Sequence, residues 1–68
     1  MYNIYRIMLF DKKHGSITVF IDEKTKKRAS AAAKSIFKKL IVGSVIKVKE
    51  PSLAEILLAD RLYKPPMY

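Results

Sequence analysis

Two hydrophobic runs lie near the start of the chain, separated by polar and glycine-containing sequence. From Tyr2 to Phe10, apolar side chains occupy both sets of alternating positions, and the run is too short for a helix of average length. It predicts a strand that is central in a sheet or buried on both faces. Ile17 to Ile21 alternates between apolar and other residues, and Asp11–Ser16 between the runs has turn composition. The pattern therefore predicts a β-hairpin.

The segment from Lys24 to Leu40 has helical rather than alternating periodicity. Thr25 is suitably placed as an N-cap, and we expect the helix to stop near Gly43. Apolar residues recur at spacings of three and four, which predicts that one face packs on the sheet. That face consists of Ala29, Ala32, Ala33, Ile36, Phe37 and Leu40.

A third strand is predicted at Val45–Lys49, where apolar residues alternate with lysines. We expect Ile46 and Val48 to face inward and the lysines to face solvent. Pro51 ends the strand because it has no backbone N–H to donate.

A second helix is predicted after Pro51. Ser52 and Glu55 have the spacing of a capping box, and the helix should run to about Tyr63. Its leucines cover more than one stripe, which favours a self-association or partner surface; a position between the sheet and another element of the same fold is the alternative. The expected interface residues are Leu53, Leu57, Leu58 and Leu62.

Together these elements predict an α+β protein in the order β-β-α-β-α. The hairpin and third strand should form a small antiparallel sheet, covered by the alanine face of the first helix, with the apolar helix at the C-terminus. We expect one domain over residues 1–63 and a short tail over residues 64–68. The tail contains Pro65-Pro66-Met67-Tyr68, which matches the Pro-Pro-x-Tyr ligand motif of WW domains.

Composition limits the chemistry that is available to this chain. Its 68 residues include no cysteine and a single histidine, His14, so disulfides are excluded and a zinc site is not expected. Half of the residues are hydrophobic, which predicts a folded protein. No apolar run approaches the ~18 residues of a membrane span, and the start of the chain does not resemble a signal peptide. We therefore expect a cytoplasmic protein.

The sequence does not predict an enzyme. His14 lies in a predicted loop without an acidic partner that would orient it, and the serines occupy ordinary turn, helix or cap positions. The spacing of the six carboxylates does not require a metal-dependent nuclease site. Two glycines, Gly15 and Gly43, are too few for a glycine-rich phosphate loop. We expect no catalytic residue, no cofactor, no metal and no small-molecule substrate.

The positive charge is concentrated in one segment. From Glu23 to Leu40, seven Lys/Arg and one acid give a net charge of +6, whereas the whole chain carries +8. Clustered cations neutralise phosphates, so we expect nucleic-acid binding with little sequence preference. A merely solvated lysine face is the alternative. The candidate contact residues are Lys24, Lys26, Lys27, Arg28, Lys34, Lys38 and Lys39 on the helix, with Lys12 and Lys13 at the hairpin tip.

Aromatic residues offer a second mode of contact with nucleic acid. Tyr2, Tyr5, Phe10 and Phe20 could stack on bases if one face of the sheet were open. In so short a chain we expect most of them to be needed in the core.

The segment from Thr25 to Leu40, 16 of the 68 residues, resembles the last helix of double-stranded-RNA-binding domains. The shared pattern is Thr25-Lys26-Lys27-x-Ala29, followed by Ala32-Ala33, Ile36-Phe37 and Leu40. The resemblance implies that Lys26 and Lys27 contact phosphates across a groove. The predicted order of elements departs from that family, since no helix precedes the strands, two strands rather than three precede the helix, and a strand and a helix follow it.

The rival interpretation is a protein-binding accessory factor, such as an inhibitor, an adaptor or a viral or phage-type assembly protein, that docks through its C-terminal helix. A homodimer or a larger protein partner would then cover the leucines. A minor structural protein of a particle, whose basic helix faces packaged nucleic acid, is a third possibility. The sequence leaves the choice between DNA and RNA open.

Overall fold

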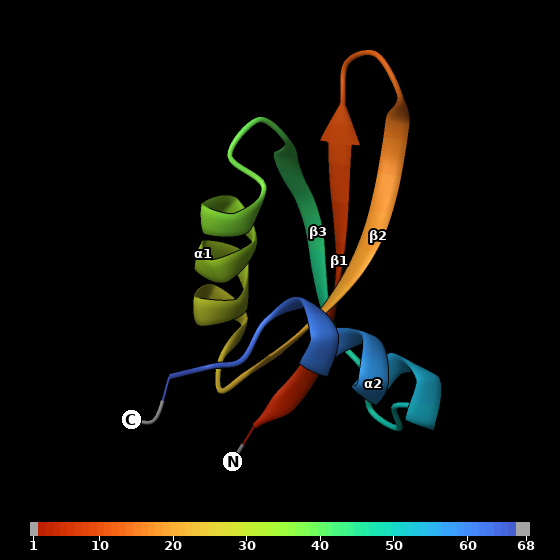
Figure 1. Cartoon of the computed structure of the whole chain (residues 1–68), viewed down its shortest axis with the longest axis vertical. Helices are drawn as coiled ribbons and strands as arrows, with labels where there is room; N and C mark the ends of the chain where they lie inside the picture. The colour runs from red at the N-terminus through yellow and green to blue at the C-terminus, as the bar shows by residue number, and fades with distance from the viewer. Residues whose placement is uncertain (1, 67–68) are drawn as a thin grey trace.

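The computed structural model describes residues 2–66 and has the predicted element order β-β-α-β-α. Three antiparallel strands form one open sheet in the order β2-β1-β3, and two helices pack on it (Figure 1). The α+β prediction is therefore confirmed. The elements are β1 (Asn3–Asp11), β2 (Gly15–Glu23), α1 (Lys26–Ile36), β3 (Ile41–Lys47) and α2 (Leu53–Leu62).

The hairpin of β1 and β2 is longer than the hydrophobic pattern suggests. Its register runs without interruption from Asn3 opposite Glu23 to Asp11 opposite Gly15, so only three residues form the turn. Gly15 has φ +85°, a conformation that glycine adopts without strain. The Asp11 carboxylate accepts a hydrogen bond from the Lys13 N–H at 3.1 Å and lies 2.7 Å from His14 Nδ1. Backbone pairing thus continues past the apolar residues, because the turn has its own polar contacts.

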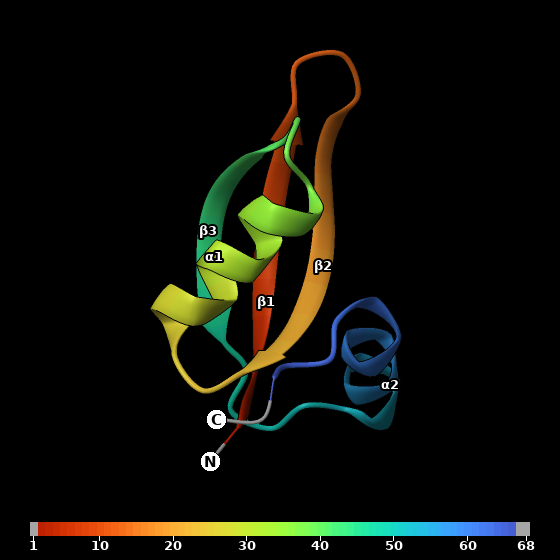
Figure 2. The same cartoon turned by 60° about the vertical axis from the view of Figure 1, so that its left-hand side comes forward.

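β1 is the central strand, as one of the two alternatives predicted, but it is buried along one face and, on the other, only at Ile4 near its start. Tyr5, Ile7 and Leu9 are buried, whereas Met8 and Phe10 on the alternate face are exposed. The prediction of burial on both faces therefore holds only at the start of β1 and is wrong for the rest of the strand, because α1 covers a single side of the sheet (Figure 2).

α1 presents its small residues to the sheet, as predicted. Ala29, Ala32 and Ala33 are buried in a core cluster with the inward side chains of the strands. Their short side chains let the helix axis lie close to the sheet. Thr25 is the N-cap, and its Oγ1 accepts a hydrogen bond from the Arg28 N–H at 3.1 Å.

The helix ends earlier than predicted, at Ile36 rather than near Gly43. Phe37 is the C-cap and leaves helical geometry at φ −111° and ψ 66°, while its N–H still bonds to the Ala33 carbonyl. Phe37 and Leu40 then pack against the core from the connecting loop. Because Phe37 and Leu40 contact the core from the loop, the chain has to leave the helix after Ile36. Lys38 and Lys39 consequently lie in a loop and not on the helix.

β3 begins earlier and faces the opposite way from the prediction. Ile7 pairs with Val45 but Leu9 pairs with Val42, so β3 has one more residue than β1 across this interval, a β-bulge. The bulge shifts the alternation and turns both valines toward the core. The expectation that Ile46 faces inward is wrong, since Ile46 is 46% exposed. Val48 follows the strand, half-buried, and its N–H bonds to the Ile4 carbonyl.

Gly43 lies inside this bulge and does not end α1. A Cβ built on Gly43 would be 2.2 Å from Cε2 of Phe10 and 3.2 Å from the Met8 carbonyl oxygen. The ring of Phe10 therefore rests on bare backbone at this position, which only glycine offers.

α2 begins with the predicted capping box. The Ser52 N–H donates to Glu55 Oε1 at 2.8 Å, and the Glu55 N–H donates to Ser52 Oγ at 3.2 Å. The helix contacts β2 and, less extensively, β1, and Ala59 is its buried residue. Just beyond it, the Tyr63 hydroxyl donates to Glu23 Oε2 at 2.9 Å, which ties the end of α2 to the end of β2.

The tail passes close to the start of the chain, where the Tyr2 hydroxyl donates to the Pro66 carbonyl at 3.2 Å. The Pro-Pro-x-Tyr match extends to Met67 and Tyr68, which lie outside the described residues.

Candidate nucleic-acid interface

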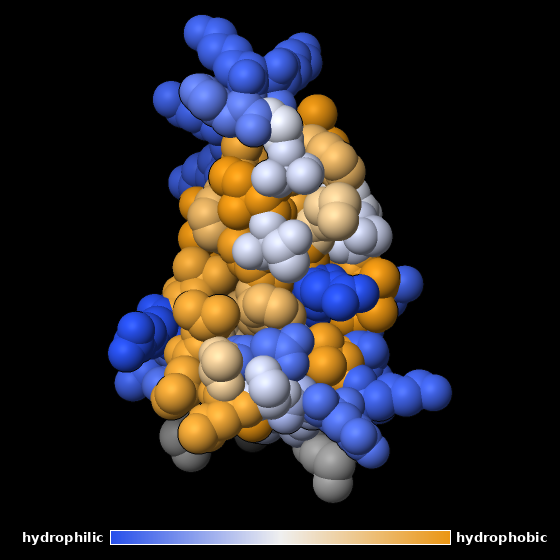
Figure 3. Space-filling model, turned by 90° about the vertical axis from the view of Figure 1, so that its right-hand side faces the viewer, coloured by the Kyte–Doolittle hydropathy of each residue, from blue (hydrophilic) through white to orange (hydrophobic). Residues whose placement is uncertain are grey.

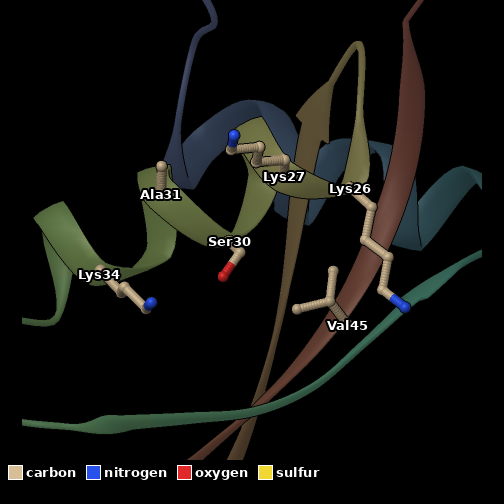
Figure 4. A pocket seen from close by; sticks show the side chains of 6 residues that line it. All are labelled: Lys26, Lys27, Ser30, Ala31, Lys34 and Val45. Atoms are coloured by element: carbon tan, nitrogen blue, oxygen red, sulfur yellow. The ribbon is translucent and has the colours of Figure 1, made fainter.

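A groove of about 540 Å³ runs between α1 and β3. Most of its lining comes from one flank of the helix, and Val45 of β3 forms part of its floor (Figure 4). The lining residues are Lys26, Lys27, Ser30, Ala31, Lys34 and Val45. We call this feature the α1–β3 groove.

Helical spacing explains which side chains enter the groove. Lys26, Ser30 and Lys34 are four residues apart and so follow one flank of α1. In Figure 4 the Ser30 hydroxyl and the Lys34 ammonium point into the groove, and Lys26 extends toward β3. Lys27 and Ala31 point outward from the helix and form its outer rim. From Lys26 to Lys34 the row spans about 12 Å of helix axis.

The groove has no nearby negative charge to balance its lysines. None of its lining residues is acidic, and within residues 2–66 no carboxylate lies at ion-pair distance from Lys26, Lys27 or Lys34. The N-terminal end of α1 carries the partial positive charge of the helix dipole, which adds to the charge of these lysines. The first turn contains no acid that would neutralise it. The site is a cationic groove with one neutral hydroxyl between two ammonium groups.

Sequence reasoning did not include Lys47 among the site residues. Lys47 pairs with Tyr5, whose side chain faces the core, so Lys47 lies on the α1 side of the sheet. The alternation of Val45–Lys49 predicted that the lysines face away from the helix. With the bulge at Gly43, Val45 and Lys47 instead face α1. Lys47 thus extends the positive charge at the end of β3.

The other predicted cations do not share this groove. Arg28 lies on the opposite flank of α1, since it is about 100° from Lys27 in the direction away from β3. Lys24 precedes the helix, and its Nζ lies 5.6 Å from the centroid of the Tyr2 ring.

The remaining predicted cations form a separate group. The loop with Lys38 and Lys39 and the turn with Lys12 and Lys13 occupy the same end of the molecule in both cartoon views (Figures 1 and 2). The structure therefore divides the predicted site into the α1–β3 groove, its margins and the end of the molecule that carries the hairpin tip.

Acidic residues gather at the end of β2 and on α2. Burial raises the pKa of Asp22 above its usual value, and the neighbouring charges of Glu23 and Asp60 raise it further. In contrast, hydrogen bonds with Ser52 hold the pKa of Glu55 below its usual value, with a smaller contribution from the charge of Arg6. These acids are thus separate from the lining of the α1–β3 groove.

The sheet face opposite α1 is open and apolar. Register places Phe20, Arg6 and Ile46 in one row across the three strands, Thr18 and Met8 in the next, and Phe10 and Ile41 in a third. Figure 3 shows this side of the molecule, where hydrophobic surface extends from near the hairpin tip to α2. We define the open sheet face as Met8, Phe10, Phe20, Ile41 and Ile46.

The predicted leucine surface on α2 is only partly available. Leu53, Leu57 and Leu58 are 73%, 49% and 53% exposed, whereas Leu62 is half-buried against the core. Leu58 and Leu62 also line a small hollow with Thr18, Val19 and Phe20, next to the open sheet face. Of the aromatic residues considered for stacking, Tyr5 is in the core and Phe10 is exposed.

Comparison with family models, with curated proteins and with solved structures gives no match for this chain. The local resemblance of α1 to a double-stranded-RNA-binding helix is therefore not extended to a family.

Within residues 2–66 no helix has the length and apolar character needed to cross a membrane. The same residues contain no group of three or more His, Cys, Asp or Glu side chains that could hold a metal ion.

Proposed function

We propose that this protein is a small non-enzymatic binding protein whose α1–β3 groove holds the phosphate backbone of a nucleic acid. The observation that carries the proposal is the row Lys26–Ser30–Lys34 beside β3, lined without a single acid. Two ammonium groups supply charge, and the hydroxyl between them can donate to a phosphate oxygen.

The length of the row fits a run of phosphates. About 12 Å of helix axis corresponds to three or four nucleotides of one duplex strand, at ~3.4 Å per nucleotide. The groove offers charge and a hydroxyl but no set of side chains arranged to read base edges, which favours binding with little sequence preference. Lys27 on the rim and Lys47 at the end of β3 would add contacts to neighbouring phosphates.

The salt dependence of binding to a 20-base-pair duplex DNA tests the proposal. Replacing Lys26 and Lys34 by Gln removes two phosphate contacts, so the slope of log affinity against log salt should become shallower by roughly 1.8, at ~0.9 per contact. Binding to unrelated duplex sequences should weaken to the same extent. Fluorescence anisotropy between 50 and 300 mM salt measures both quantities.

A matched control separates the groove from net charge. Lys49→Gln with Lys64→Gln removes the same two charges outside the groove and should leave the slope nearly unchanged. Equal losses in the two double variants would show that only net charge matters. Binding that disappears by about 150 mM salt in the unsubstituted protein would favour the solvated-face alternative and, with it, the accessory-factor interpretation.

A further inference from the structure

The open sheet face is an apolar surface of this molecule that nucleic-acid binding leaves unused. Among residues 2–66, eleven large hydrophobic side chains are exposed, whereas six hydrophobic residues other than alanine are buried. Four of the eleven, Met8, Phe10, Ile41 and Ile46, lie on the open sheet face. A chain of this size without disulfides or metal has little core to stabilise it, and a second copy is a common source of the missing burial. We propose that two copies of this chain pair through their open sheet faces. The inference does not depend on nucleic-acid binding.

The area of the face fits a small, weakly associating dimer. The uncovered part is three strands wide and about five residues long, roughly 14 by 17 Å, and the adjoining flank of α2 adds roughly 150 Å². The projected area of roughly 400 Å² lies within the range of the largest apolar patches on monomers. A standard interface buries ~800 Å² per partner, so pairing through this face corresponds to a small interface of the size found in weak, concentration-dependent dimers.

Its charges favour a second copy over a polyanion. The first outward row contains Arg6, on the central strand, between Phe20 and Ile46, and the charge of Arg6 contributes to the lowered pKa of Glu55. The face therefore contains a cation and borders on the acid of α2, and a two-fold partner can match this pair of opposite charges with its own Glu55 and Arg6. A nucleic acid would instead require an excess of cations, and these lie around α1.

Face-to-face pairing also accommodates the overall charge of +8 per chain. The two α1 helices would lie on the outer sides of the dimer, one on each, with both sheets between them (Figure 2). Repulsion between the cationic surfaces is then at its weakest, and added salt should strengthen the dimer by screening what repulsion remains.

Sedimentation equilibrium from about 5 to 500 µM tests the pairing. We expect a dimer whose dissociation constant rises about 100-fold or more in Ile46→Glu, because the new carboxylate would be buried at the interface. Ile36→Glu is the matched control, since Ile36 is 39% exposed on the α1 side and Ile46 is 46% exposed on the open face. The control should change the dissociation constant less than ~3-fold.

Disulfide cross-linking between engineered cysteines tests the pairing without introducing a charge that weakens the dimer. The natural chain has no cysteine, so Met8→Cys, Thr18→Cys and Ile46→Cys each introduce a single thiol on the open side of the sheet. At least one should form a disulfide-linked dimer on mild oxidation, while Ser35→Cys on α1 should not.

Three results would overturn the proposal. One is a monomer at every concentration with no cross-link from the open side. Another is a dimer that survives Ile46→Glu but dissociates in Leu57→Glu, which would place the interface on the outer side of α2. The third is a monomer whose nucleic-acid binding is lost in Ile46→Glu, which would assign the face to base stacking.

Discussion

Two adjacent acids at the end of β2 show how strongly single side chains depend on their surroundings. Glu23 is 1% exposed, and its carboxylate accepts hydrogen bonds from the Lys24 N–H at 2.8 Å and from the Tyr63 hydroxyl. Asp22 points to the other face, where burial and two like charges raise its pKa. One acid stabilises the junction of β2 with α2, and the other destabilises it when ionised.

Asp22→Asn should therefore raise the melting temperature at neutral pH. Because the pKa of Asp22 is higher in the folded state, the folded protein binds more protons than the unfolded chain above pH 3.8. Stability falls as pH rises through this window, and the loss remains at neutral pH. The gain from Asn should shrink on acidification and vanish below about pH 3.8, as thermal unfolding followed by circular dichroism between pH 3 and 7 would show.

Asp11→Asn is the control of opposite sign. Its hydrogen bond with His14, together with that from the Lys13 N–H, lowers the pKa of Asp11, so the variant should lose stability at neutral pH. A gain from Asp22→Asn that is the same at pH 3 and pH 7 would contradict the explanation through ionisation.

At the scale of elements, β3 shows how one irregularity changes a whole strand. The bulge turns Val42 and Val45 toward α1, leaves Ile46 on the open face and brings Lys47 to the α1 side. Gly43 permits this arrangement because the ring of Phe10 occupies the position of its missing Cβ. The bulge therefore determines both the floor of the α1–β3 groove and the composition of the open sheet face.

Gly43→Ala should destabilise the fold by about 1–3 kcal/mol, since the methyl group overlaps the Phe10 ring and would lie 3.2 Å from the Met8 carbonyl oxygen. Urea unfolding measures the effect, and Ser44→Ala in the same bulge is the control with little change expected. Phe10→Ala removes the ring, so most of the cost of Gly43→Ala should disappear in that background. Full persistence of the cost there would show that the backbone, and not Phe10, excludes a side chain at position 43.

At the scale of the whole molecule, charge and hydrophobicity are segregated on opposite sides of one sheet. The sheet separates the cationic helix α1 from the apolar open face, and the molecule is only 18 Å thick along its shortest axis. A layer this thin buries one face of its sheet well and leaves the other exposed. The same geometry gives the proposed phosphate contacts and the proposed pairing separate surfaces, so that both can be occupied together.

If pairing supplies part of the stability, the melting temperature should depend on protein concentration. A 100-fold increase in concentration should raise it by about 5–10 °C for a chain of this length. Scanning calorimetry at several concentrations, with Ile46→Glu as a variant without this dependence, measures the effect. A melting temperature that is the same at all concentrations would argue that the monomer is fully stable by itself.

Much of the fold was predictable because its determinants are local. The order of the elements, the hairpin, the alanine face of α1 and the Ser52–Glu55 capping box depend on spacings of two to four residues and on turn chemistry. The candidate cations were also visible, because seven of them fall within a single segment of the sequence.

The tertiary structure decided which face each residue occupies. The end of α1 at Ile36 follows from Phe37 and Leu40 reaching the core, and the inward side of β3 follows from its pairing with β1. Both depend on contacts with strands far away in sequence, which periodicity does not record. For the same reason, the sequence alone grouped nine cations into one site, whereas the fold places only Lys26, Lys27 and Lys34 of them in the α1–β3 groove.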